Sequence, residues 1–226
     1  MSETAQARGP ASYEALHRAV VERIVAELRP VRRTWPVSVR WALWLSLEAG
    51  VLLFLIYHGH RPDLGAQLRN PSYLLGVASF AAAGLLAAAF TLRAAIPGRE
   101  PRTSEIGFLV LLAGASAMLL FRQPIDGNVP MAQFISTGVP CAIGVATFAT
   151  VPWLAILWAT RRAAPLSGAK AGTLAGAAAF LFTFALMRVA CPIDERMHLM
   201  VWHLMPALIG TALSACVGAA ILRRRR

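Results

Sequence analysis

The strongest constraint on this chain is a series of six long apolar stretches, which are separated by short polar segments. A helix that crosses the hydrocarbon core of a bilayer needs about 20 mostly apolar residues, with about 17 as a lower bound. Backbone polar groups cannot stay unpaired in lipid, so only helices or closed barrels cross it, and the length and Leu/Ala content of these stretches exclude barrel strands. We therefore predict an all-α polytopic membrane protein with a bundle of six transmembrane helices. The predicted spans, of which the third is the weakest, are Trp41–Tyr57, Pro71–Leu92, Glu105–Phe121, Val139–Thr160, Ala171–Ala190 and Leu199–Leu222.

Basic residues are distributed unevenly among the segments that connect the spans. If the N-terminus is cytoplasmic, 17 of the 22 Lys and Arg residues lie on the cytoplasmic side, before the first span, in two loops and after the last span. Cytoplasmic loops carry an excess of Lys and Arg, so both termini are predicted to be cytoplasmic. The net charge of +11 is then explained by topology, and we expect no direct contact with nucleic acid. The basic residues on the outer side are Arg61, Arg69, Arg122, Arg188 and Arg196.

The segments outside the spans are short. The chain divides into a cytoplasmic N-terminal arm (residues 1–40), a transmembrane domain (residues 41–222) and a basic cytoplasmic tail (residues 223–226). The first residues lack the apolar core and cleavage site of a signal peptide. An arm of this size is too small for a catalytic domain with its own core. The sequence also lacks metalloprotease, esterase, Walker A and dinucleotide-binding motifs, so we expect neither an enzyme nor a cofactor.

Within the arm, residues 13–31 have the pattern of an amphipathic helix. Leu16, Val20, Ile24 and Leu28 recur every four residues and so share one face, and Ser12 suits the N-cap position. Three interpretations fit this pattern. The segment is a helix that lies on the inner leaflet, a docking helix for a cytoplasmic protein, or a segment that is disordered until a partner binds.

Two of the three cysteines are predicted to lie at the same outer depth of the membrane. Cys141 begins the fourth span and Cys191 ends the fifth, and these spans are antiparallel neighbours. A disulfide needs Cα atoms about 4.4–6.8 Å apart, which adjacent helix ends can meet, and disulfides persist in an oxidising periplasm. The alternative is that both are small apolar residues of membrane helices, as we expect for Cys216, which lies deeper in the sixth span.

Charged and aromatic residues flank the second of these cysteines. Arg188 lies one helical turn before Cys191 and would favour its thiolate, whereas Asp194 and Glu195 would oppose it. Trp202 suits the belt of aromatic residues at a membrane interface.

Four histidines are predicted to lie on the same side of the membrane. His198 and His203 are five residues apart, so in a regular helix they do not share a face as an i, i+4 metal pair would. Thiols, imidazoles and thioethers together could hold a soft metal ion, for which the two outer cysteines are the candidate ligands. The alternative is that the histidines cap helix ends, which we favour for His58 and His60.

Two further features lie inside the spans. Glu48 falls near the middle of the first span, where an ionisable group is costly and indicates function. Such a group would suit a small polytopic transporter or ion-handling protein. Gly168, Gly172 and Gly176 recur every four residues, a pattern that permits close contact between helices, and we attribute it to packing.

Several short motifs, taken in order, resemble the NrsF family of bacterial inner-membrane anti-sigma factors with six spans. The C-terminal block from Cys-Pro-x-Asp to Trp-His is the most specific of them, and Glu195 stands where family members often have a second Asp. The resemblance covers nearly the whole chain. The motifs are Ala26-Glu-Leu-Arg-Pro-Val-Arg-Arg33, Pro140-Cys141, Pro152-Trp153, Arg161-Arg162-Ala-Ala-Pro165, Cys191-Pro-Ile-Asp194 and Val201-Trp202-His203.

The resemblance implies a function. Such proteins hold an extracytoplasmic-function sigma factor at the bacterial inner membrane and keep it from RNA polymerase. The family's cysteine pair maps to Cys141 and Cys191, which are associated with sensing metal or oxidative stress and releasing the sigma factor. We expect the arm to bind the sigma factor through its apolar face. The competing hypothesis is a small transporter that uses Glu48 and the outer histidines.

Overall fold

The computed structural model describes residues 10–27, 35–96, 98–125, 129–163 and 165–222. The chain divides into two compact units, residues 1–34 and residues 35–226. The described residues form helices and no strand. Six helical segments of the second unit are long and apolar enough to cross a membrane, which confirms the predicted all-α architecture with six spans.

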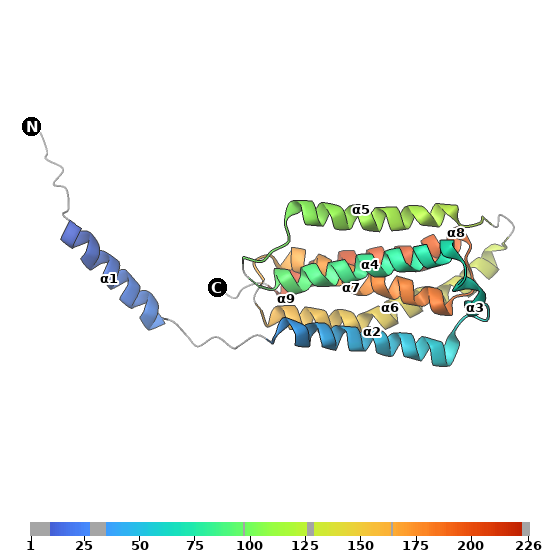
Figure 1. Ribbon diagram of the computed structural model, residues 1–226, viewed down its shortest axis with the longest axis horizontal. Coiled ribbons are helices and arrows are strands. Elements are labelled where there is room, and N and C mark those ends of the chain that lie inside the picture. The colour runs from blue at the N-terminus through green and yellow to red at the C-terminus, as the bar shows by residue number, and fades with distance from the viewer. Residues whose placement is uncertain (1–9, 28–34, 97, 126–128, 164, 223–226) are drawn as a thin grey trace, which may run out of the picture. The chain divides into compact units, whose positions relative to one another are not determined.

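The spans run side by side as a bundle, and successive spans point in opposite directions (Figure 1). Because the connections are short, one end of the bundle carries the ends of the odd-numbered spans and the starts of the even-numbered spans. The short helix α3 (Leu64–Gln67) lies in the first of these connections, which the sequence predicts to be a loop. The spans are α2 (Val37–Gly59), α4 (Pro71–Ala94), α5 (Thr103–Leu119) continued by the 3₁₀ turn η1 (Leu120–Arg122), α6 (Met131–Arg161), α7 (Gly168–Ala190), and the run of α8 (Arg196–Leu199), η2 (Met200–Leu204) and α9 (Met205–Ile221).

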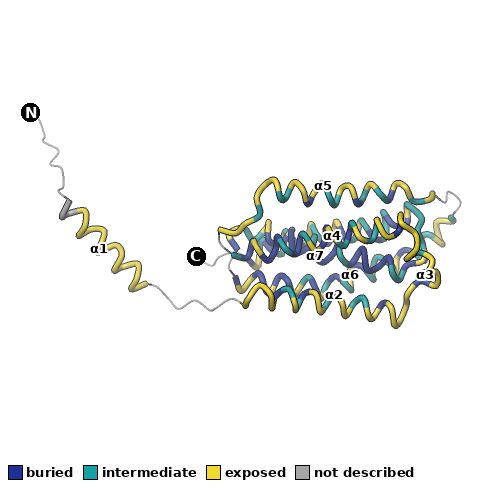
Figure 2. Tube along the Cα trace, in the orientation of Figure 1, coloured by how far each residue is buried: buried dark blue, intermediate teal, exposed yellow. Residues whose placement is uncertain are grey.

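Helix α7 forms the centre of the bundle. Within an 18-residue stretch of its span 72% of the residues are buried, against 17–39% in the corresponding stretches of the other five spans, and Figure 2 shows buried residues along most of its length. Its many Gly and Ala residues allow α4 and α9 to approach its backbone closely. Phe184 of α7 stacks on Phe80 of α4 with ring centroids 4.0 Å apart. A shift of α7 would therefore change the packing of most of the bundle.

The glycines of α7 serve packing, as the sequence predicts. A Cβ atom on Gly172 would lie 2.8 Å from the Cα atom of Gly218 in α9, closer than real Cβ contacts allow. The same contact contains a hydrogen bond from Ser214 Oγ to Gly172 O at 2.6 Å, and Trp153 Nε1 donates to Ser214 Oγ at 2.6 Å. The small residues thus let two backbones approach, and a polar side chain fastens them.

Replacing Gly172 by alanine should destabilise the bundle by about 1–3 kcal/mol, because the new methyl group meets backbone that cannot move aside. Thermal unfolding of the purified protein in detergent measures this effect. The matched control is Gly107→Ala in α5, where a Cβ atom meets nothing within 4 Å; it should be neutral or stabilising by up to about 1 kcal/mol. Equal stability of the two variants would contradict close α7–α9 packing.

Helix α6 differs from the prediction. It begins at Met131, eight residues before the predicted start at Val139, so Pro140 lies inside the helix rather than at its beginning. The prediction followed apolarity, and residues 131–138 include Gln133, Ser136 and Thr137. Helix formation does not require an apolar sequence, so the helix includes these polar residues. The segment 122–138, which lies between the third and fourth predicted spans and is predicted to be a loop, is therefore helical from Met131 onward.

The first unit contains α1 (Pro10–Glu27). Ser12 lies within this helix, so the prediction that it forms the N-cap is wrong; Pro10 is well suited to a first helical position because it lacks an N–H group. Leu16, Val20 and Ile24 are 60%, 49% and 56% exposed, so α1 presents an apolar face without covering it. Leu28 and the basic tail of residues 223–226 lie outside the described residues.

Candidate functional site

Polar and sulfur-bearing side chains gather at one end of the bundle. At this end α2, α5 and α7 end, and α3 and α8 lie there (Figure 1). We call it the cysteine end. It contains two adjoining groups. The first, the thiol–imidazole cluster, consists of Cys141, Cys191, His198 and His203. The second, the ion-pair network, consists of Arg61, Asp63, Arg188 and Asp194.

The structure brings the two predicted cysteines together. Cys141 Sγ and Cys191 Sγ are 3.6 Å apart, and both are free thiols. Cys191 is buried and caps the C-terminus of α7, where its backbone N–H donates to Met187 O. Cys141 follows Pro140 in α6 and points its thiol toward Thr137 O, 3.7 Å away. Cys216 is exposed in α9 and does not belong to the cluster.

His198 and His203 join these thiols, which corrects the prediction that they do not share a face. Their ring centroids are 5.5 Å apart, and Cys191 Sγ lies 3.4 Å from His198 Nε2. One potential ligand atom from each of the four residues lies within 4.8 Å of all the others. In a regular α-helix two residues five apart point about 140° away from each other.

A π-turn explains this arrangement. Residues Met200–Leu204 are π-helical, and the N–H of Met205 donates to Met200 O, five residues earlier. Pro206 follows directly and has no N–H to donate to the carbonyl of Trp202, so the regular ladder is interrupted at this point. The wider turn rotates His203 back toward His198. Such π-turns inside helices occur frequently at functional sites.

Trp202, for which a position in the interfacial belt stays a prediction, packs against α6. Its ring lies 5.4 Å from that of Phe134, and a Cβ atom on Gly138 would overlap its indole. A glycine is therefore required at position 138 for this contact. The tryptophan fixes the π-turn against the same helix that carries Cys141.

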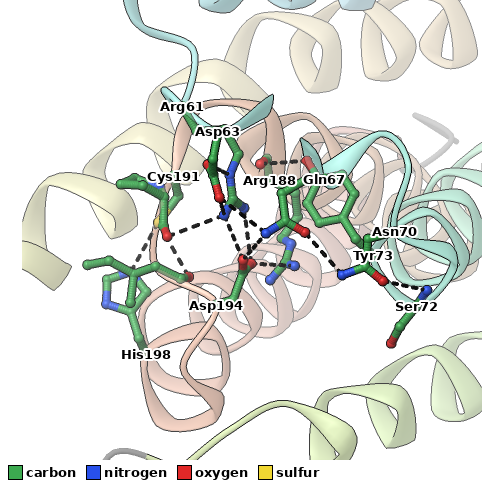
Figure 3. Close-up of polar contacts among 12 residues, drawn as sticks. Arg61, Asp63, Gln67, Asn70, Ser72, Tyr73, Arg188, Cys191, Asp194 and His198 are labelled. Atoms are coloured by element: carbon green, nitrogen blue, oxygen red, sulfur yellow. Dashed lines mark hydrogen bonds and ion pairs between the residues drawn. The ribbon is translucent and has the colours of Figure 1, made fainter. Parts of the chain in front are cut away.

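Arg61 is the main residue of this region that the sequence does not reveal. The sequence presents it as one of five outer basic residues, but its side chain is 1% exposed. Its guanidinium donates to Asp63 and to Asp194, each at 2.6 Å (Figure 3). Its backbone N–H donates to Val189 O at 2.9 Å. The loop after α2 is thus fastened to the segment that contains Cys191.

Arg188 completes the ion-pair network. Its guanidinium lies 2.6 Å from Asp194, and its carbonyl accepts a hydrogen bond from Tyr73 Oη at 2.8 Å. Arg188 and Asp194 are thus paired with each other, and their predicted opposite effects on the Cys191 thiolate stay predictions. Glu195 is also occupied, since its carboxylate accepts hydrogen bonds from Met197 N and His198 N and caps α8.

The electrostatics of the groups outside the spans follow from these contacts. Burial alone would lower the pKa of Arg61, but hydrogen bonds to Asp194 and Asp63 raise it above its ordinary value. The same hydrogen bond from Arg61 lowers the pKa of Asp63 to about 2. A hydrogen bond from Cys141 lowers the pKa of the Cys191 thiol, with a smaller contribution from His198 and against the effect of burial. Arg61 and Asp63 are therefore both ionised near neutral pH.

The remaining candidates do not join the cluster. His58 and His60 are exposed at the end of α2, where His60 Nδ1 contacts Ile56 O at 2.8 Å, in keeping with the favoured interpretation as helix-end residues. Glu48 is buried in the middle of α2, and neither carboxylate oxygen has a hydrogen-bond partner within the described part of the chain. Its role stays a prediction.

One sequence signal could have led to the ion-pair network. Arg188 interrupts an apolar span, and a charged residue at such a position needs a partner of opposite charge. Asp194 is the nearest acidic residue along the chain. Nothing local to Arg61 indicates that it reaches Asp194, 133 residues away.

Comparison with models of protein families identifies NrsF, described as negative regulator of sigma F, over residues 24–223. Comparisons with curated proteins and with solved structures found no match. The matched residues include all six spans, the thiol–imidazole cluster and the ion-pair network. The chain therefore belongs to the NrsF family, the negative regulators of sigma F.

Proposed function

We propose that this protein is an anti-sigma factor of a bacterial inner membrane, which holds an extracytoplasmic-function sigma factor on the cytoplasmic face and releases it when the Cys141–Cys191 pair reacts. The observation that carries the proposal is the pair of free thiols 3.6 Å apart at one end of the bundle. Membership of a family of negative sigma regulators supplies the class of partner. The signal is a metal ion or an oxidant that reaches the thiols.

The distribution of charge supports a sidedness for this mechanism. The end of the bundle opposite the cysteines, where α2 and α7 begin, is basic. Cytoplasmic segments carry the excess of Lys and Arg, which supports a cytoplasmic position for this end and a periplasmic position for the cysteine end. The described basic residues at the cytoplasmic end are Arg40, Arg93, Arg99, Arg102, Arg161, Arg162 and Lys170.

Oxidation would change the geometry of the pair. A disulfide has a sulfur–sulfur distance of about 2.05 Å, so the two Sγ atoms, now 3.6 Å apart, would approach by about 1.5 Å. The two thiols would lose two protons and two electrons to the oxidant, for example a peroxide that is reduced to water. Because Cys141 lies in α6 and Cys191 ends α7, the new bond would pull these helices together.

The central position of α7 provides a route from the thiols to the cytoplasmic end. Helix α7 packs against α4, α6 and α9 over most of its own length. A change from mostly bound to mostly free sigma factor requires about 5.5 kcal/mol of differential affinity. A disulfide contributes about 2–4 kcal/mol and a structural zinc site about 10–16 kcal/mol, so either event is of the required order.

The arm is the proposed docking element for the sigma factor, because α1 exposes an apolar face that its own unit does not cover. Replacing Leu16, Val20 and Ile24 by serine in the full-length protein should weaken sigma binding at least about 100-fold. Each hot-spot residue contributes about 2 kcal/mol or more, so the loss of two of the three would already exceed the about 2.8 kcal/mol of a 100-fold change. Co-purification and a titration of the sigma factor against the detergent-solubilised protein measure this loss.

The matched control for the arm replaces Glu14 and Glu22, which are exposed in α1 outside the face formed by Leu16, Val20 and Ile24, by glutamine. This variant should bind the sigma factor with nearly unchanged affinity. If a variant that lacks residues 1–34 captures the sigma factor as well as the intact protein does, the arm is not the docking element.

A further inference from the structure

We propose that Cys141, Cys191, His198 and His203 form a closed four-coordinate site for one zinc-like ion. The proposal concerns the ion and its ligands, and only its regulatory meaning rests on the proposed function. The sequence names the two cysteines as candidate ligands and leaves His198 and His203 as possible accessory residues that do not share a helix face. The two histidines enter because the π-turn rotates His203 onto the face of His198.

The distances fit tetrahedral coordination. With zinc–sulfur bonds of about 2.3 Å and zinc–nitrogen bonds of about 2.0–2.1 Å, a tetrahedron has a sulfur–sulfur edge of about 3.8 Å and a sulfur–nitrogen edge of about 3.5 Å. Cys141 Sγ and Cys191 Sγ are 3.6 Å apart, and Cys191 Sγ lies 3.4 Å from His198 Nε2. One ion can therefore bind all four residues after small side-chain movements.

The burial of His203 independently indicates a ligand. Its side chain is 0% exposed, and neither ring nitrogen has a hydrogen-bond partner among the residues that the structure describes. A buried polar group without a partner is costly, because it has given up its hydrogen bonds to water and gained none in return. Coordination through one ring nitrogen would satisfy His203, which has a ring nitrogen within 4.8 Å of the ligand atoms of the other three residues.

The donor set determines the class of ion. Thiolate and imidazole ligands favour borderline or soft ions such as zinc, whereas magnesium and calcium prefer oxygen ligands. Four protein ligands leave no open position for a substrate, which is typical of structural rather than catalytic zinc sites. Binding of M²⁺ would release the two thiol protons, so that two thiolates and two neutral imidazoles surround the ion.

The neighbouring groups hold the ligands in place. Glu195 accepts a hydrogen bond from the backbone N–H of His198 at 2.6 Å, and Trp202 fixes the π-turn against α6. The ion-pair network fastens the segment that follows Cys191. An ion in this site would link α6, the end of α7 and the start of the last span. It would also exclude a disulfide, because both use the same two sulfur atoms.

The full-length protein, purified in detergent under reducing conditions and then freed of reductant, tests the site with Zn²⁺ and Co²⁺ as probes. We expect one Zn²⁺ per chain by elemental analysis, and a Co²⁺ spectrum with thiolate charge-transfer and tetrahedral ligand-field bands. His203→Gln and His198→Gln should each lose these bands. Their affinity for Zn²⁺ should fall by more than the ~100-fold that loss of an outer-shell contact can cause.

The matched controls are Cys216→Ser and His60→Gln, which remove an exposed thiol and an exposed imidazole outside the cluster and should bind both ions like the unchanged protein. A second measurement needs no substitution in the cluster. Zn²⁺ should protect Cys141 and Cys191, but not Cys216, from N-ethylmaleimide. Wild-type protein that binds no stoichiometric Zn²⁺, or a His203→Gln variant that binds it unchanged, would overturn the site.

These measurements need no sigma factor, so the site and the proposed function can fail separately. If the protein binds no Zn²⁺ but the thiols are still required for sigma release, the metal site is wrong and thiol sensing stands. If Zn²⁺ binds through all four ligands but removal of the thiols leaves sigma release unchanged, the site is supported and the sensing function falls.

Discussion

Replacing both Cys141 and Cys191 by serine should abolish the release of the sigma factor in response to metal or oxidant, while repression without the stressor persists. Serine is close to cysteine in size, so the helices keep their packing. It forms no disulfide and is a much poorer ligand for a soft ion. A full switch requires a difference of about 5.5 kcal/mol in sigma-factor binding between the unstressed and the stressed states, and the variant should lose this difference. A reporter gene controlled by the sigma factor measures induction before and after the stressor.

The control for this experiment is Cys216→Ser, which removes the exposed third thiol and should leave induction intact. Two results would contradict the mechanism. A double serine variant that still responds normally would show that the thiols are not the sensor. A double serine variant that is active without any stressor would show that reduced thiols are needed to hold the sigma factor, which reverses the proposed direction of the switch.

Replacing Asp194 by asparagine should destabilise the bundle by about 3–5 kcal/mol, the cost of leaving a buried charge without its partner. Asp194 pairs with Arg61 and with Arg188, and both arginine side chains are almost completely buried. Arg61 would keep Asp63, but Arg188 would lose the one ion pair that it makes among the described residues. Thermal unfolding in detergent, with sigma repression as a second readout, measures the effect.

The matched control is Asp63→Asn. Asp63 also pairs with Arg61, but its side chain is 46% exposed, so water can replace the lost contact. We expect an unfolding temperature close to that of the unchanged protein, because exposed ion pairs contribute little to stability. If the Asp63 and Asp194 variants unfold at the same temperature, the buried ion pairs of Asp194 do not stabilise the bundle more than the exposed ion pair of Asp63 does.

The sequence by itself determined the architecture of this protein. The thickness of the bilayer sets the length of a span, and the cost of unpaired backbone groups in lipid requires helices, so hydropathy alone gives six spans. Alternation of direction then places the start of the fourth span and the end of the fifth at the same end of the bundle. The contact between Cys141 and Cys191 follows from this alternation once neighbouring spans pack together.

The tertiary structure decided the composition of the site. His198 and His203 share a face only because a π-turn interrupts the regular helix before Pro206, and helical periodicity predicts the opposite. Arg61 reaches Asp194 across 133 residues of sequence, and only folding determines that the loop after α2 lies against the end of α7. Hydropathy and spacing report local preferences, whereas a ligand set or an ion-pair network depends on which distant segments are held in contact.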